Sequence, residues 1–378
     1  MKLKKELRTI QEIEDFVRGC TFYSTCGGGI PEEGINVLKS ELSKGRIIGW
    51  VDVKSIPDEA WTACAYAAGS MAPSTTEKKQ LLTNFGLKEP KYNRKTKLIR
   101  AIEELSRYTG KKIEAIVPKV LGGGNTPGPL SAAVASGIPF VDGDYVGRAI
   151  PETSQTTPCI FGKTITPVCI VDDWGNVSII KEVLNYSMLE RIEKLISVGG
   201  FGPTGNASFL MKGKEMKEVI IPGTLTDCFN LGQLIRISRE KHSDTVVEII
   251  KKLPAWLLIR GEVIEKQEED KDGYYTGEYK LRGEKAFKGQ ELKVWFKLEN
   301  HIAWKDNKVV ATSPDLISVI DDESGEPIIN PKIKPGEKVA VLVTKAKPIF
   351  RSKKGIEVLG PRHFGYDFDY IPIEDLHR

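Results

Sequence analysis

The sequence predicts an α/β protein in which a three-layer α/β/α sandwich is followed by a smaller antiparallel, β-barrel-like domain. Three observations lead to this prediction. Roughly the first 250 residues alternate helix-like and strand-like segments, which is typical of a sheet covered by helices. From Leu257 onward apolar and polar residues alternate, and helical periodicity nearly disappears. The chain has 378 residues, 40% of them hydrophobic, so it is long enough for two domains.

The N-terminal elements follow from local signals. Residues Thr9–Val17 have the spacing of an amphipathic helix, and Cys20–Ser24 are expected to form a short strand. A helix is expected from Pro31 to about Ser43, because proline suits the first helical turn and the acidic residues after it suit the helix dipole. Apolar runs and turn residues then predict a strand at Arg46–Val53, a buried segment at Ala60–Gly69, a helix at Lys95–Tyr108, a strand at Lys112–Val117, a short helix at Pro129–Ser136 and a strand at Pro139–Val141.

The same local signals predict the helices and strands of the second half of the body and of the β-rich part. A hairpin is expected from Thr164–Val171 and Val177–Ile180, which flank a turn-forming sequence. Helices are expected at Leu189–Val198, Leu225–Arg239 and Ser243–Lys252, and strands at Tyr274–Leu281, Leu292–Leu298, Lys338–Thr344 and Ile349–Arg351. We therefore divide the chain into an α/β body at 1–254, with two lobes meeting near 165, a β-rich domain at 255–345, and a segment at 346–378 that returns to the body.

The amino-acid composition and charge exclude several functional classes. The 55 basic and 51 acidic residues are well mixed and give a net charge of only +4, which does not indicate nucleic-acid binding. No apolar run reaches the roughly 18 residues that span a bilayer, and the charged start lacks a signal-peptide core. We expect a cytoplasmic protein that binds neither nucleic acid nor membrane. The six cysteines form no C-x-x-C pair and the four histidines no H-E-x-x-H motif, so any metal site would combine distant residues.

Glycine-rich loops follow several of the expected elements. Such loops lie at Gly27–Gly29, Gly122–Asn125 and Gly199–Asn206, and the first of them matches neither of the common nucleotide-binding motifs. Glycine allows the backbone to approach a ligand closely, although such loops also serve as plain linkers. We expect backbone or side-chain contacts to a ligand from five residues: Gly27, Gly28, Gly122, Gly123 and Asn125.

The acidic segment Asp142–Glu152 is the clearest candidate site. It follows the apolar run Ile138–Val141 and contains Asp142, Asp144, Arg148 and Glu152. Acidic groups in one cleft repel, so they bind a cation, share a proton or pair with a base such as Arg148. A divalent metal such as zinc is one option that this leaves open, and an acidic surface turn is another.

Two further features carry reactive side chains. Cys26 precedes a glycine loop and a helix start, where a thiol can be activated as a nucleophile, although a structural thiol is the plainer interpretation. The segment Gly360–Tyr370 combines His363 and Asp367 with several aromatic residues. We expect it to close a cleft formed by the loops at 25–29, 122–125 and 142–152, with His363 or Asp367 near Asp142 or Asp144. Arg148 is expected to pair with a carboxylate of its own segment or with Asp367 or Asp369.

Several motifs in one order resemble the S-methyl-thiohydantoin desulfurase family, long known as a domain of unknown function beside hydantoinase and oxoprolinase genes. The motifs lie at Thr25–Gly29, Gly69–Pro73, Val117–Asn125, Pro139–Pro151, Pro222–Thr224 and Gly360–Tyr370. The resemblance spans nearly the whole chain and implies an α/β/α domain, a β-barrel-like domain and work on thiohydantoin or hydantoin rings. Two positions depart from the family pattern. Members carry a glutamate where this chain has Val120, and a glycine where it has Cys26, which leaves the substrate and any metal open.

The resemblance implies a hydrolase in which water attacks a C=S or C–S-methyl carbon and sulfide or thiol leaves. Asp142 or Asp144 would take the proton from water, directly or through a metal. Arg148 would bind a ring carbonyl or a substrate carboxylate, the glycine loops would hold developing charge, and His363 would protonate the leaving group. The alternative is a non-catalytic ligand-binding or subunit-type partner of a hydantoinase- or oxoprolinase-like enzyme. Acyl or redox chemistry at Cys26 is a third option. We also expect a homo-oligomer.

Overall fold

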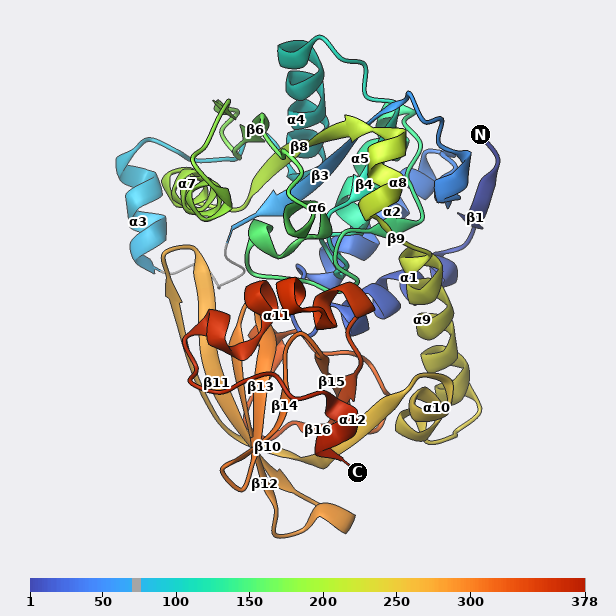
Figure 1. Cartoon of the computed structure of the whole chain (residues 1–378), viewed down its shortest axis with the longest axis vertical. Coiled ribbons are helices and arrows are strands. Elements are labelled where there is room, and N and C mark those ends of the chain that lie inside the picture. Colours follow the sequence, from blue (N-terminus) through green and yellow to red (C-terminus); the bar gives the residue numbers. More distant parts are fainter. Residues whose placement is uncertain (70–75, 378) are drawn as a thin grey trace.

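The computed structural model describes residues 1–69 and 76–377, so residues 70–73 of the Gly69–Pro73 motif lie outside the described residues. Figure 1 shows a mixed α/β body stacked on a curled β-rich part. The body contains β1 (Leu3–Leu7), α1 (Ile10–Tyr23), α2 (Pro31–Ser43), β2 (Ile48–Val51), β3 (Trp61–Ala68), α3 (Thr76–Asn84), α4 (Arg94–Thr109), β4 (Ala115–Pro118), α5 (Pro127–Ser136), β5 (Gly143–Asp144), α6 (Thr157–Ile160), β6 (Val168–Val171), β7 (Val177–Ile180), α7 (Tyr186–Gly199), β8 (Thr204–Lys212), α8 (Gly213–Val219), β9 (Ile221–Pro222), α9 (Thr224–Glu240) and α10 (Thr245–Lys252).

A mixed sheet organises the body. Its strand order is β4-β3-β8-β6-β7, with β3 and β4 parallel and the other neighbours antiparallel. Single parallel bridges from Phe140 to Ile116 and from Val141 to Val51 join β4 to β2, which pairs in turn with β1. Residues 140–141 thus connect two sheets and bring the acidic segment directly to their shared edge.

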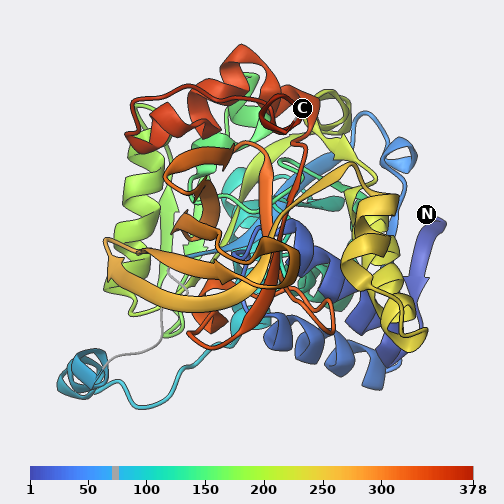
Figure 2. The ribbon, with the colours of Figure 1, turned by 90° about the horizontal axis from the view of Figure 1, so that it is seen from below.

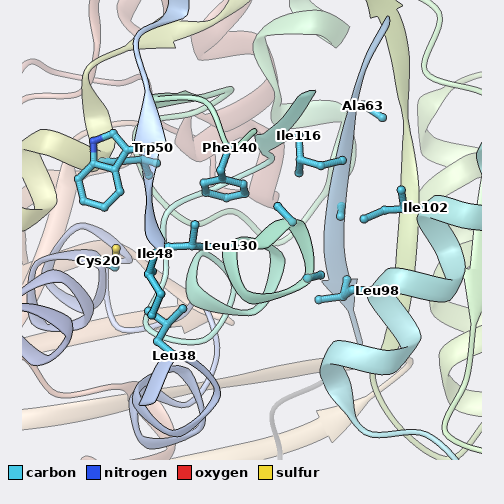
Figure 3. Packing of buried hydrophobic residues seen from close by; sticks show 14 of the residues in the cluster. Cys20, Leu38, Ile48, Trp50, Ala63, Leu98, Ile102, Ile116, Leu130 and Phe140 are labelled. Carbon is cyan, nitrogen blue, oxygen red and sulfur yellow. The ribbon is translucent and has the colours of Figure 1, made fainter. Parts of the chain in front are cut away.

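The hydrophobic core of the body lies between this sheet and its helices. Figure 3 shows side chains from α2, α4 and α5, among them Leu38, Leu98 and Leu130, packed against Ile116 and Phe140. Each is at most 2% exposed, and burying one such side chain contributes roughly 1.5–3 kcal/mol. The coarse prediction of a mixed α/β body is confirmed, and its three-layer detail stays a prediction.

The β-rich part is one antiparallel sheet of seven strands that curls into a half-barrel (Figure 2). Its strands are β10 (Ala255–Lys271), β11 (Tyr274–Gly283), β12 (Glu291–Lys297), β13 (Glu299–Lys305), β14 (Lys308–Thr312), β15 (Leu316–Asp321) and β16 (Lys338–Thr344). Alternate residues face the interior, as at Leu292, Val294 and Phe296 of β12, which are fully buried. The chain then forms α11 (Lys353–Leu359), which lies beside the body in Figure 1, and α12 (Ile373–Leu376), which packs against β14 of the half-barrel.

Several local predictions are wrong for identifiable reasons. Cys20–Ser24 do not form a strand, because α1 continues to Tyr23 and buries Cys20 on its inner face. Pro139–Val141 make only the two isolated bridges described above. Ile349–Arg351 lie in a 3₁₀ turn that begins at Pro348, whose fixed φ and missing N–H suit a helical turn better than a strand. The short strand β1, the long strand β8 and the helices α3 and α8 were not predicted.

Candidate functional site

Three predicted loops meet at a small cavity between the body and the half-barrel. The cavity has a volume of about 50 Å³, enough for a water molecule. It is lined by Gly28, Ala67, Ala68, Gly69, Lys119, Asn125, Ile150, Pro151, Thr153, Glu190, Lys194, Leu298 and Glu299. Loops from the body, helix α7 and strand β13 therefore contribute to one site.

Backbone contacts between the glycine loops hold this site together. The carbonyl of Gly28 accepts hydrogen bonds from the amides of Gly124 (3.1 Å) and Asn125 (2.9 Å). A Cβ on Gly122 would lie 2.3 Å from the Gly28 oxygen, so only glycine permits the approach. Gly123 packs in the same way against Thr21 and Pro31. The predicted meeting of the first two loops is confirmed.

Glu299 is the most unusual acid of the cavity. It is 3% exposed, and its Oε2 atom has no hydrogen-bond partner among the described residues. Its Oε1 lies over Gly27, where a Cβ would approach it to 2.2 Å, and the Gly28 amide donates to the carboxyl group. Burial raises the pKa of Glu299 to about 8, although the charges of Arg148 and Lys194 act in the opposite direction. Glu299 is therefore mainly a neutral acid at pH 7.

A buried relay begins at Lys119. Its ammonium donates to the Thr153 hydroxyl (2.7 Å), which donates to Glu193 Oε2 (3.2 Å). The other oxygen of Glu193 accepts from the Tyr66 hydroxyl (2.6 Å) and from Asn206 (2.8 Å). Burial raises the pKa of Glu193, and the positive charge of Lys119 opposes this shift. The relay thus places a fixed cation and a hydroxyl group at the cavity wall.

A second cation, Lys194, lies on the α7 side of the cavity. It is 6% exposed and lies 3.7 Å from Glu190 Oε1 and 4.6 Å from the centre of the Tyr274 ring. Glu190 also accepts from the Thr153 amide (2.7 Å) and from the Tyr274 hydroxyl (3.2 Å). These contacts couple α7 to the half-barrel and direct two ammonium groups toward one small volume.

The two predicted aspartates are engaged within the fold. Asp142 accepts from the amides of Leu225 and Thr226 (both 3.1 Å) at the start of α9, and pairs with Lys4 at 2.8 Å. Asp144 accepts from the Gly147 amide at 2.7 Å, and burial raises its pKa to about 6. Neither side chain lines the cavity, and their catalytic roles stay predictions.

The prediction for the partners of Arg148 is wrong. Arg148 is 1% exposed and forms no ion pair with the carboxylates of its own segment, Asp367 or Asp369 among the described residues. Its position between the body and the half-barrel surrounds it with backbone oxygens. It donates to the carbonyls of Ala149 (2.9 Å), Pro314 (3.0 Å), Asp315 (3.2 Å) and Asn300 (3.1 Å), and to the Thr25 hydroxyl (3.0 Å). Burial lowers its pKa to about 10, against the nearby charge of Glu299.

The C-terminal segment contacts the acidic segment 142–152 at Glu152, and not at Asp142 or Asp144 as predicted. His363 lies 2.9 Å from Glu152, rather than beside Asp142 or Asp144. Burial acts to raise the pKa of Glu152, but the His363 contact and the charge of Lys297 lower it to about 2. Asp367 is almost fully exposed and pairs with Arg362, so it does not line the cavity. Aromatic contacts anchor the segment; for example, the ring centres of Phe364 and His301 lie 4.1 Å apart.

The two departures from the family pattern both lie in packed interiors. Cys26 is 2% exposed, accepts from the Asn300 amide group at 3.1 Å, and has its pKa raised to about 12 by burial. A protonated, buried thiol favours the structural interpretation over a nucleophile. Val120 packs in an apolar cluster with Val146, Ile160 and Leu316, where an ionised glutamate would be unfavourable.

The described residues contain neither a cluster of metal ligands nor a helix that could span a membrane. The ranges 1–69 and 76–377 contain no group of three or more His, Cys, Asp or Glu side chains placed to hold a metal ion. The zinc option therefore finds no ligand set in those ranges. Within the same ranges, no helix has the length and apolar character required to cross a bilayer.

Sequence reasoning did not identify the polar residues that line the cavity, Lys119, Thr153, Glu190, Lys194 and Glu299, or Glu193, which accepts from Thr153 behind them. Lys119 directly follows β4, so the rule that ligand sites lie at the carboxyl ends of strands could have identified it. Glu299 begins the run Glu299-Asn300-His301, three polar residues in an otherwise apolar strand pattern, and all three are buried. The charged residues of α7 resemble a solvated helix face, so the sequence offers no signal for their burial.

Family models and a solved structure place the chain among known proteins. The model of the S-Me-THD-like N-terminal domain matches residues 11–182, and that of the C-terminal domain matches residues 185–373. A crystal structure of a protein from Chromobacterium violaceum, 17% identical, aligns with a TM-score of 0.75 over 98% of this chain and 100% of that one, which shows a shared fold. The search of curated proteins finds no match. Because the two family models cover nearly all of the chain, it belongs to the S-Me-THD-like, or S-methyl-thiohydantoin desulfurase-like, family.

Proposed function

We propose that this protein is a hydrolase of thiohydantoin- or hydantoin-like five-membered rings, in which water replaces sulfur on a ring carbon. Family membership supports the class of substrate. The observation that carries the chemistry is Glu299, a buried acid with a pKa of about 8 and one oxygen without a partner among the described residues. A group whose pKa lies near the working pH can both give and take a proton.

The first step is proton transfer to the ring and addition of water. On a ring with an S-methyl group on a C=N carbon, neutral Glu299 protonates the ring nitrogen and becomes a carboxylate. The water oxygen then bonds to that carbon, while the Glu299 carboxylate takes one proton from the water. The cavity, at about 50 Å³, has room for this water beside the acid.

The second step expels sulfur. Glu299 protonates the sulfur as the C–S bond breaks, and the new hydroxyl group returns its proton to Glu299 as the C=O bond forms. The products are a ring carbonyl and methanethiol, and a free thiohydantoin gives sulfide by the same sequence. Lys119 and Lys194 supply ammonium groups at the cavity wall, which would stabilise negative charge that develops on oxygen or sulfur.

The test compares Glu299→Gln with the wild type on S-methyl-thiohydantoin and thiohydantoin rings, with the sulfur-free hydantoin, the product of the reaction, as a ligand for binding only. Thiol or sulfide release is followed with a thiol-reactive dye, and ring binding is measured by calorimetry. Glutamine has the size and neutral charge of the protonated acid, so we expect binding to persist while kcat falls by about 10²–10⁴-fold.

The matched control is Glu269→Gln, an exposed glutamate of β10 that should retain full activity. Unchanged turnover by Glu299→Gln would contradict the proposal. A wild-type protein that binds these rings and releases neither thiol nor sulfide would instead favour the non-catalytic, subunit-type role.

A further inference from the structure

Helix α7 buries Leu189 in the core of the body, as an ordinary surface helix does, but it also buries charged side chains and exposes several apolar ones. Its buried side includes Glu190, Glu193 and Lys194, the charged residues around the cavity. Its outer side exposes Leu195 (54%) and Val198 (51%), together with Met188. A surface helix normally buries its apolar stripe and solvates its charges. Met188, Leu195 and Val198 therefore form an apolar stripe without a covering element among the described residues.

Neighbouring side chains extend this stripe into a patch. Leu184, just before α7, is 89% exposed, and Phe85, just after α3, is 69% exposed. The Phe85 ring contacts Phe201 at 5.5 Å, which brings the end of α3 to the end of α7. Figure 1 shows the two helices on the same flank of the body. We call the following six residues the α7 patch: Leu81, Phe85, Leu184, Met188, Leu195 and Val198.

We propose that the α7 patch is a dimer interface, in which two copies of this chain pack their α7 helices antiparallel around a two-fold axis near residue 193. The exposed positions 188, 191, 195 and 198 are separated by three, four and three residues. An antiparallel pairing centred at 193 therefore sets Met188 opposite Val198 of the second copy, and Arg191 opposite Leu195. This spacing is the same in both directions along the helix, so it is compatible with the two-fold symmetry of a homodimer.

The size of the patch suits a dimer. With roughly 150–200 Å² for each fully exposed large side chain, the exposed fractions of the six residues amount to about 600 Å² of apolar surface. A stable interface buries about 800 Å² on each partner, and about 65% of a homodimer interface is apolar. The patch therefore supplies the apolar part of a standard interface without help from other surfaces.

Dimer formation would also support the cavity. Glu190 and Lys194 are buried whereas Leu195 is exposed, so a second α7 would support from the solvent side the helix that carries them. This inference does not rest on the proposed hydrolase activity. An inactive protein could still dimerise through α7, and a monomer could still hydrolyse rings.

The first test measures the mass of the full chain in solution by light scattering after gel filtration. One chain has a mass of 41.9 kDa, so the wild type should show about twice this value. Leu195→Arg places a positive charge opposite Arg191 of the second copy and should raise the dissociation constant at least about 100-fold, giving monomers. The control is Ile47→Arg, which adds the same charge at a residue that is 66% exposed elsewhere and should leave the dimer intact.

The second test probes the antiparallel arrangement with engineered cysteines. The six native cysteines are all buried, so new surface thiols react alone. The double variant Met188→Cys/Val198→Cys should form a covalent dimer under mild oxidation, because each new thiol faces one of the second copy. Met188→Cys alone should not, since ten helical residues separate the two positions by about 15 Å, beyond the roughly 7 Å limit for a disulfide. A monomeric wild type, an intact Leu195→Arg dimer, or equal cross-linking of the single and double variants would overturn the proposal.

Discussion

Glu299→Gln should change how the stability of the protein depends on pH. The carboxyl group has a pKa of about 8 in the folded protein, against 4.5 as the ordinary value. The unfolded chain therefore releases this proton at a lower pH than the folded chain does. The sign follows directly: the contribution of the protonated Glu299 to stability is complete below pH 4.5 and is lost as the pH rises through about 8. Glutamine does not titrate, so the variant lacks this loss.

The magnitude follows from the gap between the two pKa values. One pKa unit corresponds to about 1.4 kcal/mol, so the difference between 4.5 and about 8 amounts to about 5 kcal/mol. About 4 kcal/mol of this contribution to the unfolding free energy is lost between pH 5 and pH 9. Because every other titrating group is common to both proteins, the difference in unfolding free energy between variant and wild type isolates Glu299.

The assay is urea unfolding followed by the fluorescence of the six tryptophans, at pH 5, 6, 7, 8 and 9. The unfolding free energy of Glu299→Gln should rise relative to that of the wild type across this range, by about 4 kcal/mol in total. Glu269→Gln serves as the control for the same substitution at an exposed glutamate. Parallel curves for the wild type and Glu299→Gln would refute the argument, since they would mean that Glu299 ionises at the same pH in both states.

Three further predictions concern the contacts around the cavity. Thr153→Val keeps the shape of the side chain but removes the hydroxyl between Lys119 and Glu193, and should lower the unfolding free energy by about 1–3 kcal/mol in urea titrations; an unchanged midpoint would show that water replaces the hydroxyl. Gly27→Ala adds a methyl group 2.2 Å from Glu299 Oε1 and should lower both the melting temperature and kcat, whereas Gly199→Ala, with no atom within 4 Å, should alter neither. Asp142→Asn removes the charge from an acceptor of two helix amides and should lower the melting temperature without changing the KM for ring substrates; a raised KM would return Asp142 to the site.

The fold was largely predictable because its signals are local and repeated. Alternation along β12, the proline at the start of α2 and the glycine after α4 each fix an element through backbone geometry, and the structure confirms all three. The glycine loops were also informative, because a glycine that permits close backbone contact is needed wherever two loops pack, as at Gly28 and Gly122. Local rules failed where tertiary contacts decided the outcome, as at Cys20, which continues a helix because its side chain is buried there.

The residues of the candidate site were harder to predict because charge in a sequence does not reveal exposure. Asp142 and Lys194 are both charged residue types, and the sequence does not distinguish their surroundings. In the structure, Asp142 accepts hydrogen bonds from amides of α9, whereas Lys194 lines the cavity. For α7, the arrangement of Glu190, Lys194 and Leu195 satisfies the helical period whichever side faces inward. The helical period assigns each residue to one of two faces, but it does not determine which face is exposed to solvent. Only the packing of the half-barrel against the body decides this, by enclosing the charged face around Glu299. The same packing leaves Leu195 in solvent, so the site and the apolar patch follow from one orientation of one helix.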